Sequence, residues 1–96
     1  MAGYVLVDIV WEDEEGLEQY ASRIGDTLGP FGGEFVTRGT GYTTVEGDWE
    51  LDGRLVMLRF PTPELASDWY RSDAYAPLLA LRKRAARTKM IFFDGN

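Results

Sequence analysis

The sequence predicts an α+β fold of the ferredoxin-like type, with a single domain over residues 1–96 and both helices on one face of an antiparallel sheet. Strand and helix patterns follow one another in the order β-α-β-β-α-β. The length of 96 residues allows one domain. The hydrophobic content of 45% and the charged content of 27% are those of an ordinary globular protein.

Residues 4–11, YVLVDIVW, are rich in β-branched and apolar side chains and predict the first strand. Because side chains alternate along a strand, one face carries Val5, Val7 and Ile9, and the other carries Tyr4, Leu6, Asp8 and Val10. The next apolar residues recur at helical spacing and predict the first helix: Leu17, Tyr20, Ala21, Ile24 and Leu28. The glycine-rich residues 29–33 end this helix.

The middle of the chain predicts two strands, residues 34–38 and 54–60, which form a hairpin. Between them lies a stretch punctuated by glycines, and Asp52-Gly53 is the turn signal of the hairpin. The second and third strands are therefore expected to be antiparallel neighbours.

The last third of the chain predicts a kinked pair of helices and a final strand. Thr62 has the position of an N-cap and Pro63 that of the first helical residue. Ser72, with the aspartate that follows it, resembles a second N-cap, so two helices are expected rather than a long one. Residues 88–95 predict the last strand.

The sheet face away from the helices is expected to be apolar. The residues expected on it are Leu6, Val10, Leu55, Met57, Met90 and Phe92. These are too many apolar groups to leave in water. The simplest cover is the same face of a second copy, which predicts a homodimer around a shared cavity.

The chain contains no cysteine and no histidine. It therefore lacks a thiolate or imidazole for a zinc site, the usual haem ligand and a Ser-His-Asp triad, and we expect neither a metal nor a cofactor. The net charge of −6 argues against binding nucleic acid. No apolar run reaches the roughly 18 residues of a membrane span, and the expected location is cytoplasmic.

Asp8 is the first candidate for catalysis. A carboxylate among apolar neighbours is costly unless it is paired or hydrogen-bonded. Arg59 is the expected partner, because the first and third strands should be neighbours. Asp8 is then either a general base whose pKa is set by the cavity and by Arg59, a structural ion pair, or an aspartate at a wet strand end.

Arg38 and Glu46 form a second candidate pair. Arg38 ends the second strand beside Gly39 and Gly41, where its guanidinium could hold a carboxylate or enolate oxygen or pair with Glu46. Glu46 precedes Gly47 in a turn and is expected to pair with Arg38 or Arg82, or to act as an acid.

Arg82 lies on or beside the apolar stripe of the last helix. The residues of this stripe are Tyr75, Leu78, Leu79, Arg82 and Ala86. Because a lone buried charge is expensive, we expect Arg82 to meet a carboxylate, Glu46 or Asp8, or a ligand anion. The alternative is that its head reaches solvent while its stem packs.

Three aromatic residues, Trp69, Tyr70 and Tyr75, are typical of a core and also carry polar groups that need partners. Tyr70 or Tyr75 beside an arginine could serve as a proton donor. Ser72 has no histidine to activate it and is expected to be a cap.

Several stretches resemble family 1330 of domains of unknown function, in the dimeric α/β-barrel superfamily. They are GY at 3–4, GGEFVTRG at 32–39, VEGDW at 45–49, RFPTPELASDWYRSDAY at 59–75 and LR at 81–82, with Tyr20 in the first helix. The resemblance implies a ferredoxin-like dimer with a pocket between sheet and helices, and no agreed activity. Neighbouring families include cofactor-free monooxygenases, lactone isomerases and haem enzymes. The segment WEDEEGLEQY departs from the helix start that relatives show.

We therefore expect a homodimer that binds a small acidic or aromatic metabolite. Its reaction would be a cofactor-free proton transfer, such as an isomerisation, cyclisation or oxygenation, with Asp8 as base and Arg38, Arg59 or Arg82 stabilising an oxyanion. The residues expected to contact the substrate are Glu46, Arg59, Trp69, Tyr70 and Tyr75. The alternative is a non-catalytic binding or structural dimer.

Overall fold

The computed structural model describes residues 1–96 and confirms the ferredoxin-like α+β fold. Its elements are β1 (Gly3–Trp11), α1 (Glu14–Leu28), a short 3-10 helix η1 (Gly29–Phe31), β2 (Glu34–Thr40), β3 (Arg54–Phe60), α2 (Pro63–Tyr70), α3 (Ala76–Ala85) and β4 (Ala86–Asp94). The sheet order is β2-β3-β1-β4, and every neighbouring pair is antiparallel. No helix could serve as a membrane span: the longest, α1, has 15 residues, and a span needs about 20.

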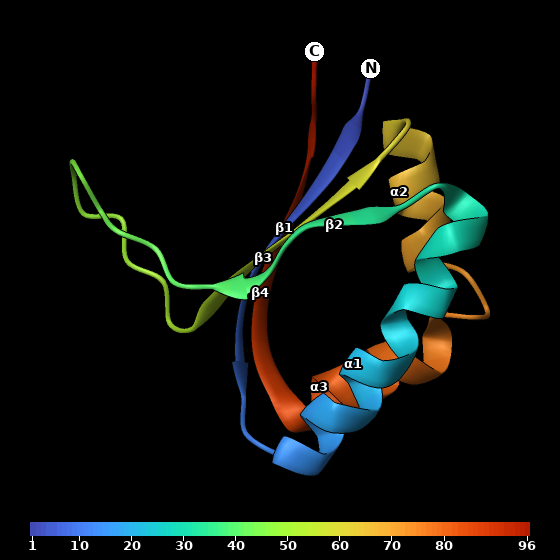
Figure 1. The fold of residues 1–96 in the computed structure, drawn as a ribbon, viewed down its shortest axis with the longest axis horizontal. Helices are drawn as coiled ribbons and strands as arrows, with labels where there is room; N and C mark the ends of the chain where they lie inside the picture. Colours follow the sequence, from blue (N-terminus) through green and yellow to red (C-terminus); the bar gives the residue numbers. More distant parts are fainter.

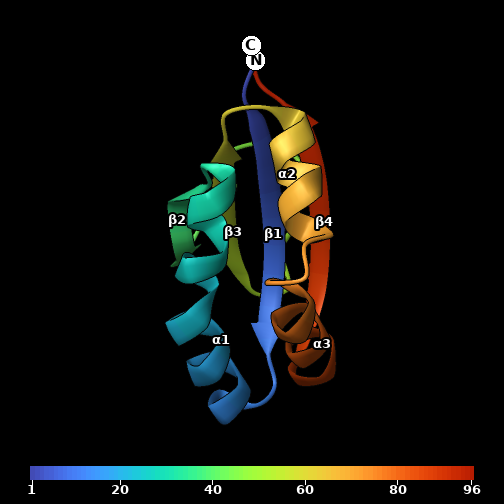
Figure 2. The same cartoon turned by 90° about the vertical axis from the view of Figure 1, so that its right-hand side faces the viewer.

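All three α-helices cover the same face of the sheet (Figure 1). Figure 2 shows that α1 lies over β2 and β3, while α2 and α3 lie over β1 and β4. The opposite face of the sheet has no helix on it. The helix-covered face therefore supplies the core, and we call the opposite one the outer face.

Side-chain caps fix where the helices begin. Asp13 accepts a hydrogen bond from the backbone of Glu15 before α1, and Thr62 accepts from Leu65 at the start of α2, both at 3.2 Å. Ser72 accepts from the backbone N–H of Tyr75 at 3.2 Å. The kinked helix pair is thus confirmed, although Ser72 caps the turn that leads into α3 and not α3 itself.

The core lies between the sheet and the helices. The largest fully buried side chains are Trp69, Tyr75, Phe60, Leu58, Leu78 and Val5. Burying each such side chain stabilises the fold by about 1.5–3 kcal/mol. The indole of Trp69 donates to Thr27 Oγ1 at 3.0 Å, and Thr27 donates to the Ile24 carbonyl at 2.7 Å, so these polar atoms are paired inside the core.

The register of β4 corrects one prediction. Met90 is paired with Val7, and Phe92 with Val5, so both lie on the helix face rather than on the outer face. Phe92 packs edge-on against Tyr70, which belongs to α2. The outer face instead carries the residues one position further along, Ile91 and Phe93. A shift of one residue along a strand moves each side chain to the other face.

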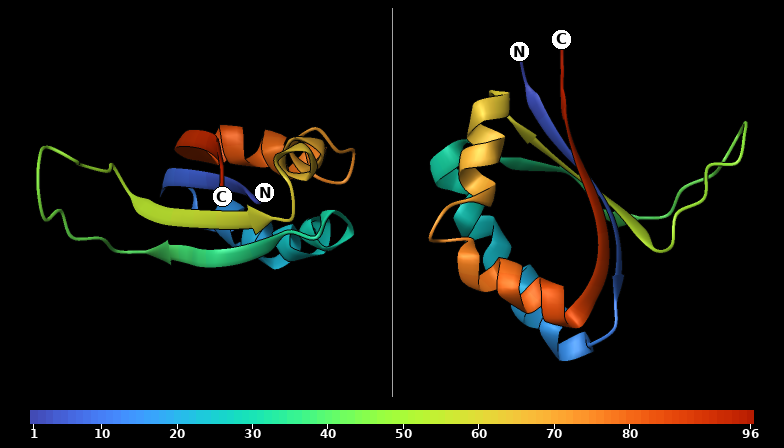
Figure 3. Two further views of the ribbon diagram at one scale, coloured as in Figure 1. Left: turned by 90° about the horizontal axis from the view of Figure 1, so that it is seen from above. Right: turned by 180° about the vertical axis from the view of Figure 1, so that it is seen from behind.

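The connection between β2 and β3 is a long arm, residues 41–53, and not a tight turn at Asp52-Gly53 as expected. The arm leaves the sheet on the side opposite the helices (Figure 3). It is held internally by Tyr42, whose hydroxyl accepts from the Leu51 backbone at 2.7 Å. Trp49 near its tip is 66% exposed. The arm therefore presents a large aromatic side chain to solvent beside the outer face.

Candidate functional site

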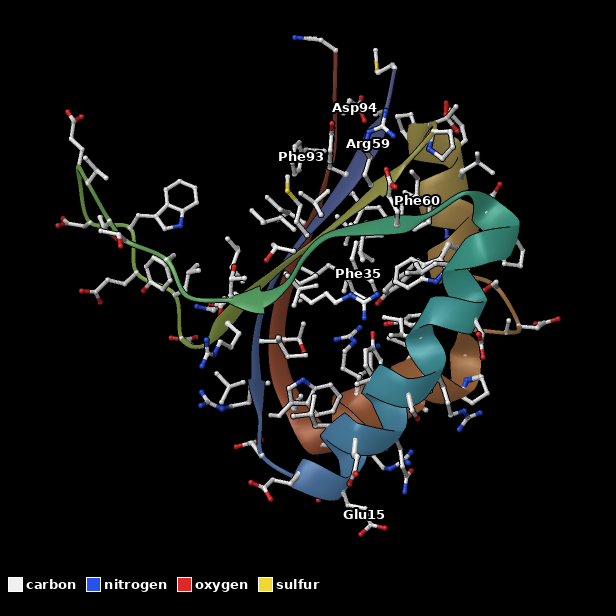
Figure 4. The ribbon with its side chains drawn as sticks, viewed as in Figure 1. Glu15, Phe35, Arg59, Phe60, Phe93 and Asp94 are labelled. Atoms are coloured by element: carbon white, nitrogen blue, oxygen red, sulfur yellow. The ribbon has the colours of Figure 1, made fainter.

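A cavity of about 210 Å³ lies between the helix face of the sheet and α1. Twelve of its fourteen lining residues are hydrophobic. Its walls include Val7 and Ile9 of β1, Tyr20 of α1 and Phe35 of β2. Figure 4 shows Phe35 in the space between the sheet and α1. A cavity of about 150 Å³ holds benzene, so this one has room for a substituted single ring.

Two arginines and no acidic residue line this cavity. Arg82 of α3 is only 4% exposed. Its single hydrogen bond within the chain runs from Nε to the hydroxyl oxygen of Tyr75, at 3.3 Å. Arg38 of β2 lies on the solvent side, with its guanidinium carbon 4.3 Å from the centre of the Phe35 ring. Neither arginine takes part in the three salt bridges of the chain.

Behind Arg82 lies a cluster of aromatic hydroxyls. The hydroxyl oxygens of Tyr20 and Tyr75 are 2.6 Å apart. Tyr75 is 0% exposed, and its ring centre lies 4.2 Å from that of Trp69 and 6.0 Å from that of Tyr70. Trp69 and Tyr20 line the cavity, whereas Tyr75 and Tyr70 form the layer behind it. The lining of the cavity therefore includes Arg82 and Tyr20, the two ends of this hydrogen-bonded cluster.

Burial controls the ionisation of these groups. It is the main reason why the pKa of Tyr20 is raised well above its ordinary value; the contact with Tyr75 raises it further, and the charge of Arg82 offsets this only in part. Burial lowers the pKa of Arg82, but the neighbouring phenols, Tyr75 first, outweigh it and the net pKa is raised. At neutral pH, Arg82 is charged and Tyr20 is protonated.

The family model of a domain of unknown function, DUF1330, matches residues 2–96. The chain belongs to this family. No curated protein matches it in sequence. The family resemblance of the sequence motifs is thereby confirmed.

Solved structures share the fold of this DUF1330 domain. RPA0582, a protein of unknown function from Rhodopseudomonas palustris, superposes with a TM-score of 0.74 at 16% identity, over 99% of this chain and 82% of that chain. SnoaB, a cofactor-independent oxygenase from Streptomyces nogalater, superposes with a TM-score of 0.63 at 12% identity, over 99% and 92%. A hypothetical protein of Arabidopsis thaliana gives 0.66 at 11% identity, over 99% and 88%. At these identities the likeness shows the ferredoxin-like fold alone.

The carboxylate partners expected for Arg82 in this DUF1330 domain were wrong. Glu46 lies exposed in the arm and pairs with neither Arg38 nor Arg82. Asp8 is on the outer face, since its Cα partner in β3 is Leu55. The exposure of 4% also excludes the alternative in which the head of Arg82 reaches solvent. Arg82 instead donates to the Tyr75 hydroxyl, and a ligand anion beside it stays a prediction.

The expected pair of Asp8 and Arg59 was also wrong. Both carboxylate oxygens of Asp8 accept backbone N–H groups, from Asp52 and Gly53, at 2.9 Å each. Arg59 lies opposite Tyr4 at the other end of the strands and pairs with the exposed Glu34 at 3.4 Å. Figure 4 shows Arg59 near the chain termini, away from the cavity. The structure thus brings Arg38, Arg82 and Trp69 to one cavity, and leaves Asp8, Glu46 and Arg59 outside it.

Sequence reasoning missed Tyr20 as a site residue. It belongs to the apolar stripe of α1, where the pattern marks it only as a core position. A signal was present, because a hydroxyl on a buried stripe needs a polar partner. The partner, Tyr75, is 55 residues away in the sequence and could not be assigned from spacing.

Proposed function

We propose that this DUF1330 domain binds a small, largely apolar anion in the cavity between the sheet and α1. The observation that carries the proposal is Arg82, a buried charge without a carboxylate partner. Its only hydrogen-bond partner within the chain is a hydroxyl, so no opposite charge offsets the cost of burying it. A ligand anion would remove this cost and gain a charge-assisted contact in a site of low dielectric constant.

The shape and lining of the cavity narrow the ligand to one ring with one acidic group. The volume of about 210 Å³ and the aromatic walls, Trp69 and Phe35, suit a planar apolar body. Arg38 on the solvent side offers a second cationic contact. Aromatic carboxylates, enolates and phenolates have this combination of features.

A cofactor-free reaction of such an anion is the catalytic form of the proposal. Arg82 and Arg38 would stabilise negative charge that develops on an oxygen. SnoaB, which shares the fold, is a cofactor-independent oxygenase. No carboxylate or lysine lines the cavity, so the substrate would enter already ionised rather than lose its proton to a side chain. The same lining favours a second candidate, a protein that binds the anion without transforming it.

Benzoate and its neutral analogue benzamide test the proposal. We expect benzoate to raise the melting temperature and to bind at least about tenfold more tightly than benzamide by calorimetry, a difference of about 1.4 kcal/mol. The variant Arg82→Met keeps the bulk and removes the charge, so it should lose this preference. If the protein bound benzoate and benzamide equally, or bound neither, the proposed anion site would be refuted.

We also propose that a second copy covers the outer face. Ile91 is 56% exposed, and Phe93 points away from the helices (Figure 4). A hollow of about 190 Å³ lies between Trp49 of the arm and this face. These features, with the barrel-type fold, support a homodimer. Sedimentation of the parent protein at micromolar concentration should give the mass of two chains, and that of the Ile91→Lys variant the mass of one. A monomeric parent protein would contradict this.

A further inference from the structure

Three side chains form a hydrogen-bonded chain that ends at the cavity wall. Arg82 Nε lies 3.3 Å from the hydroxyl oxygen of Tyr75, which lies 2.6 Å from that of Tyr20. A guanidinium can only donate hydrogen bonds. The direction of the first bond is therefore fixed, and Tyr75 accepts from Arg82.

Burial fixes the direction of the second bond. Tyr75 is 0% exposed, and the only acceptor near its hydroxyl is the oxygen of Tyr20. If Tyr20 donated to Tyr75, the hydrogen of Tyr75 would be buried without an acceptor, which is unfavourable. Tyr20 lines the cavity and Tyr75 does not, so of the two hydroxyl hydrogens we assign that of Tyr20 to the cavity side. The satisfied arrangement runs from Arg82 through Tyr75 to Tyr20.

We propose that Tyr20 is the hydrogen-bond donor that the cavity presents to an oxyanion of the ligand. Arg82 and Tyr75 act on Tyr20 as positioning residues, because they occupy its oxygen and turn its hydrogen toward the cavity. This proposal rests on the proposed function, namely an anion in the cavity. It narrows the ligand to one whose charge sits on an accepting oxygen: a carboxylate, an enolate or a phenolate.

The hydrogen bonds from Arg82 through Tyr75 also determine how strongly Tyr20 donates, and burial determines whether it gives up its proton. Each bond that a hydroxyl accepts polarises it and strengthens the bond that it donates. Burial raises the pKa of Tyr20, so the group holds its proton. Tyr20 therefore stabilises an oxyanion by donating a hydrogen bond and does not protonate it.

Calorimetry with benzoate and benzamide tests the role of Tyr20. Tyr20→Phe should weaken benzoate binding at least about tenfold, since hydrogen bonds to charged groups are the strong ones, and should change benzamide binding much less. Tyr75→Phe should give a smaller loss, because Tyr20 keeps its hydroxyl but loses its fixed direction. Tyr4→Phe is the matched control: it removes a hydroxyl that makes no hydrogen bond within the chain, on the outer face, and should leave both affinities unchanged.

The outcomes separate this proposal from the anion site itself. If Arg82→Met loses benzoate and Tyr20→Phe does not, the site stands and the role of Tyr20 is refuted. If the parent protein binds neither benzoate nor benzamide, both the anion site and the role of Tyr20 are refuted. The hydroxyl protons provide a readout without ligand: by NMR, that of Tyr75 should exchange slowly with water and that of Tyr20 rapidly. A protected Tyr20 proton beside a rapidly exchanging Tyr75 proton would overturn the assigned direction.

Discussion

Replacing Asp8 tests whether this carboxylate is a structural anchor or a general base. The side chain is 8% exposed and holds the end of the arm to β1 through the N–H groups of Asp52 and Gly53. Asp8→Ala removes both bonds and leaves two donors in a partly buried place. Asp8→Asn keeps one acceptor oxygen but turns an amide hydrogen toward the second N–H group. We expect both variants to be less stable than the parent protein, and Asp8→Ala to be the worse of the two.

The size of the loss follows from the two bonds. A hydrogen bond to a charged group contributes about 1.5–3 kcal/mol. Both donors are only partly buried, so we take the lower end for each and expect a loss of about 3 kcal/mol for Asp8→Ala. Asp8→Asn should lose about half as much. For a domain of this size, 1 kcal/mol corresponds to roughly 4–8 °C in melting temperature. Asp8→Ala should therefore melt roughly 12–24 °C below the parent protein and remain folded at room temperature.

Urea denaturation followed by circular dichroism measures this change, and benzoate binding by calorimetry is measured on the same samples. The anchor role requires a lower midpoint of unfolding with an unchanged dissociation constant for benzoate, because Asp8 is on the face opposite the cavity. A change of less than about 0.5 kcal/mol, the range of surface substitutions, would refute the anchor. An Asp8→Asn variant of normal stability that had lost a catalytic turnover would restore the general base.

Three further predictions follow from backbone contacts, burial and exposure. Gly53→Ala should lower the free energy of unfolding in urea by about 1–3 kcal/mol, because a Cβ there would collide with the Ile9 carbonyl oxygen. A Cβ at Gly25 in α1 meets no atom, so Gly25→Ala should raise the free energy of unfolding by up to about 1 kcal/mol. Equal effects of the two substitutions would contradict the contact at Gly53. Because the pKa of Tyr20 is raised on folding, this tyrosine ionises in the unfolded state first, above about pH 10. The stability of the parent protein should therefore fall there by about 1.4 kcal/mol per pH unit more than that of Tyr20→Phe. Parallel profiles of stability against pH for the two proteins would contradict this. Trp49→Ser should leave the stability of the monomer within about 0.5 kcal/mol but weaken self-association in sedimentation, and an unchanged association would place Trp49 outside the interface.

The sequence was sufficient to predict the fold because the periodicity of each element agrees with its end signals. Thr62 and Pro63 mark the start of α2, and the apolar stripe of α1 runs to Leu28 at its last turn. The two errors lie where a long-range contact decides. The register of β4 depends on its pairing with β1, which placed Met90 and Phe92 on the face opposite to the one expected. The hairpin signal at Asp52-Gly53 was overridden because Asp8 binds the backbone there.

The site was predictable only in part, for a related reason. Helical spacing placed Arg82 on a buried stripe, and the structure confirms that it is buried. Spacing also placed Tyr75, its hydrogen-bond partner, seven residues back on the same stripe, but an opposite charge was expected there instead. Tyr20 on α1 completes the cluster, and it lies 55 residues from Tyr75 in the sequence, too far to be assigned from spacing. Pairing by opposite charge was therefore the wrong rule for a site in which phenols surround the cation.

The charge distribution of the chain gives the strongest restriction on what this cavity can hold. The whole chain carries −6, yet the residues that line the cavity include two arginines and no acid. An acidic surface repels ligands with several negative charges at long range. Inside the apolar walls the single buried charge of Arg82 acts through a low dielectric constant, while that of exposed Arg38 is screened by water. If the cavity binds an anion, as proposed, a monoanion gains most of the attraction and suffers the least repulsion, which favours one negative charge on a compact, apolar body.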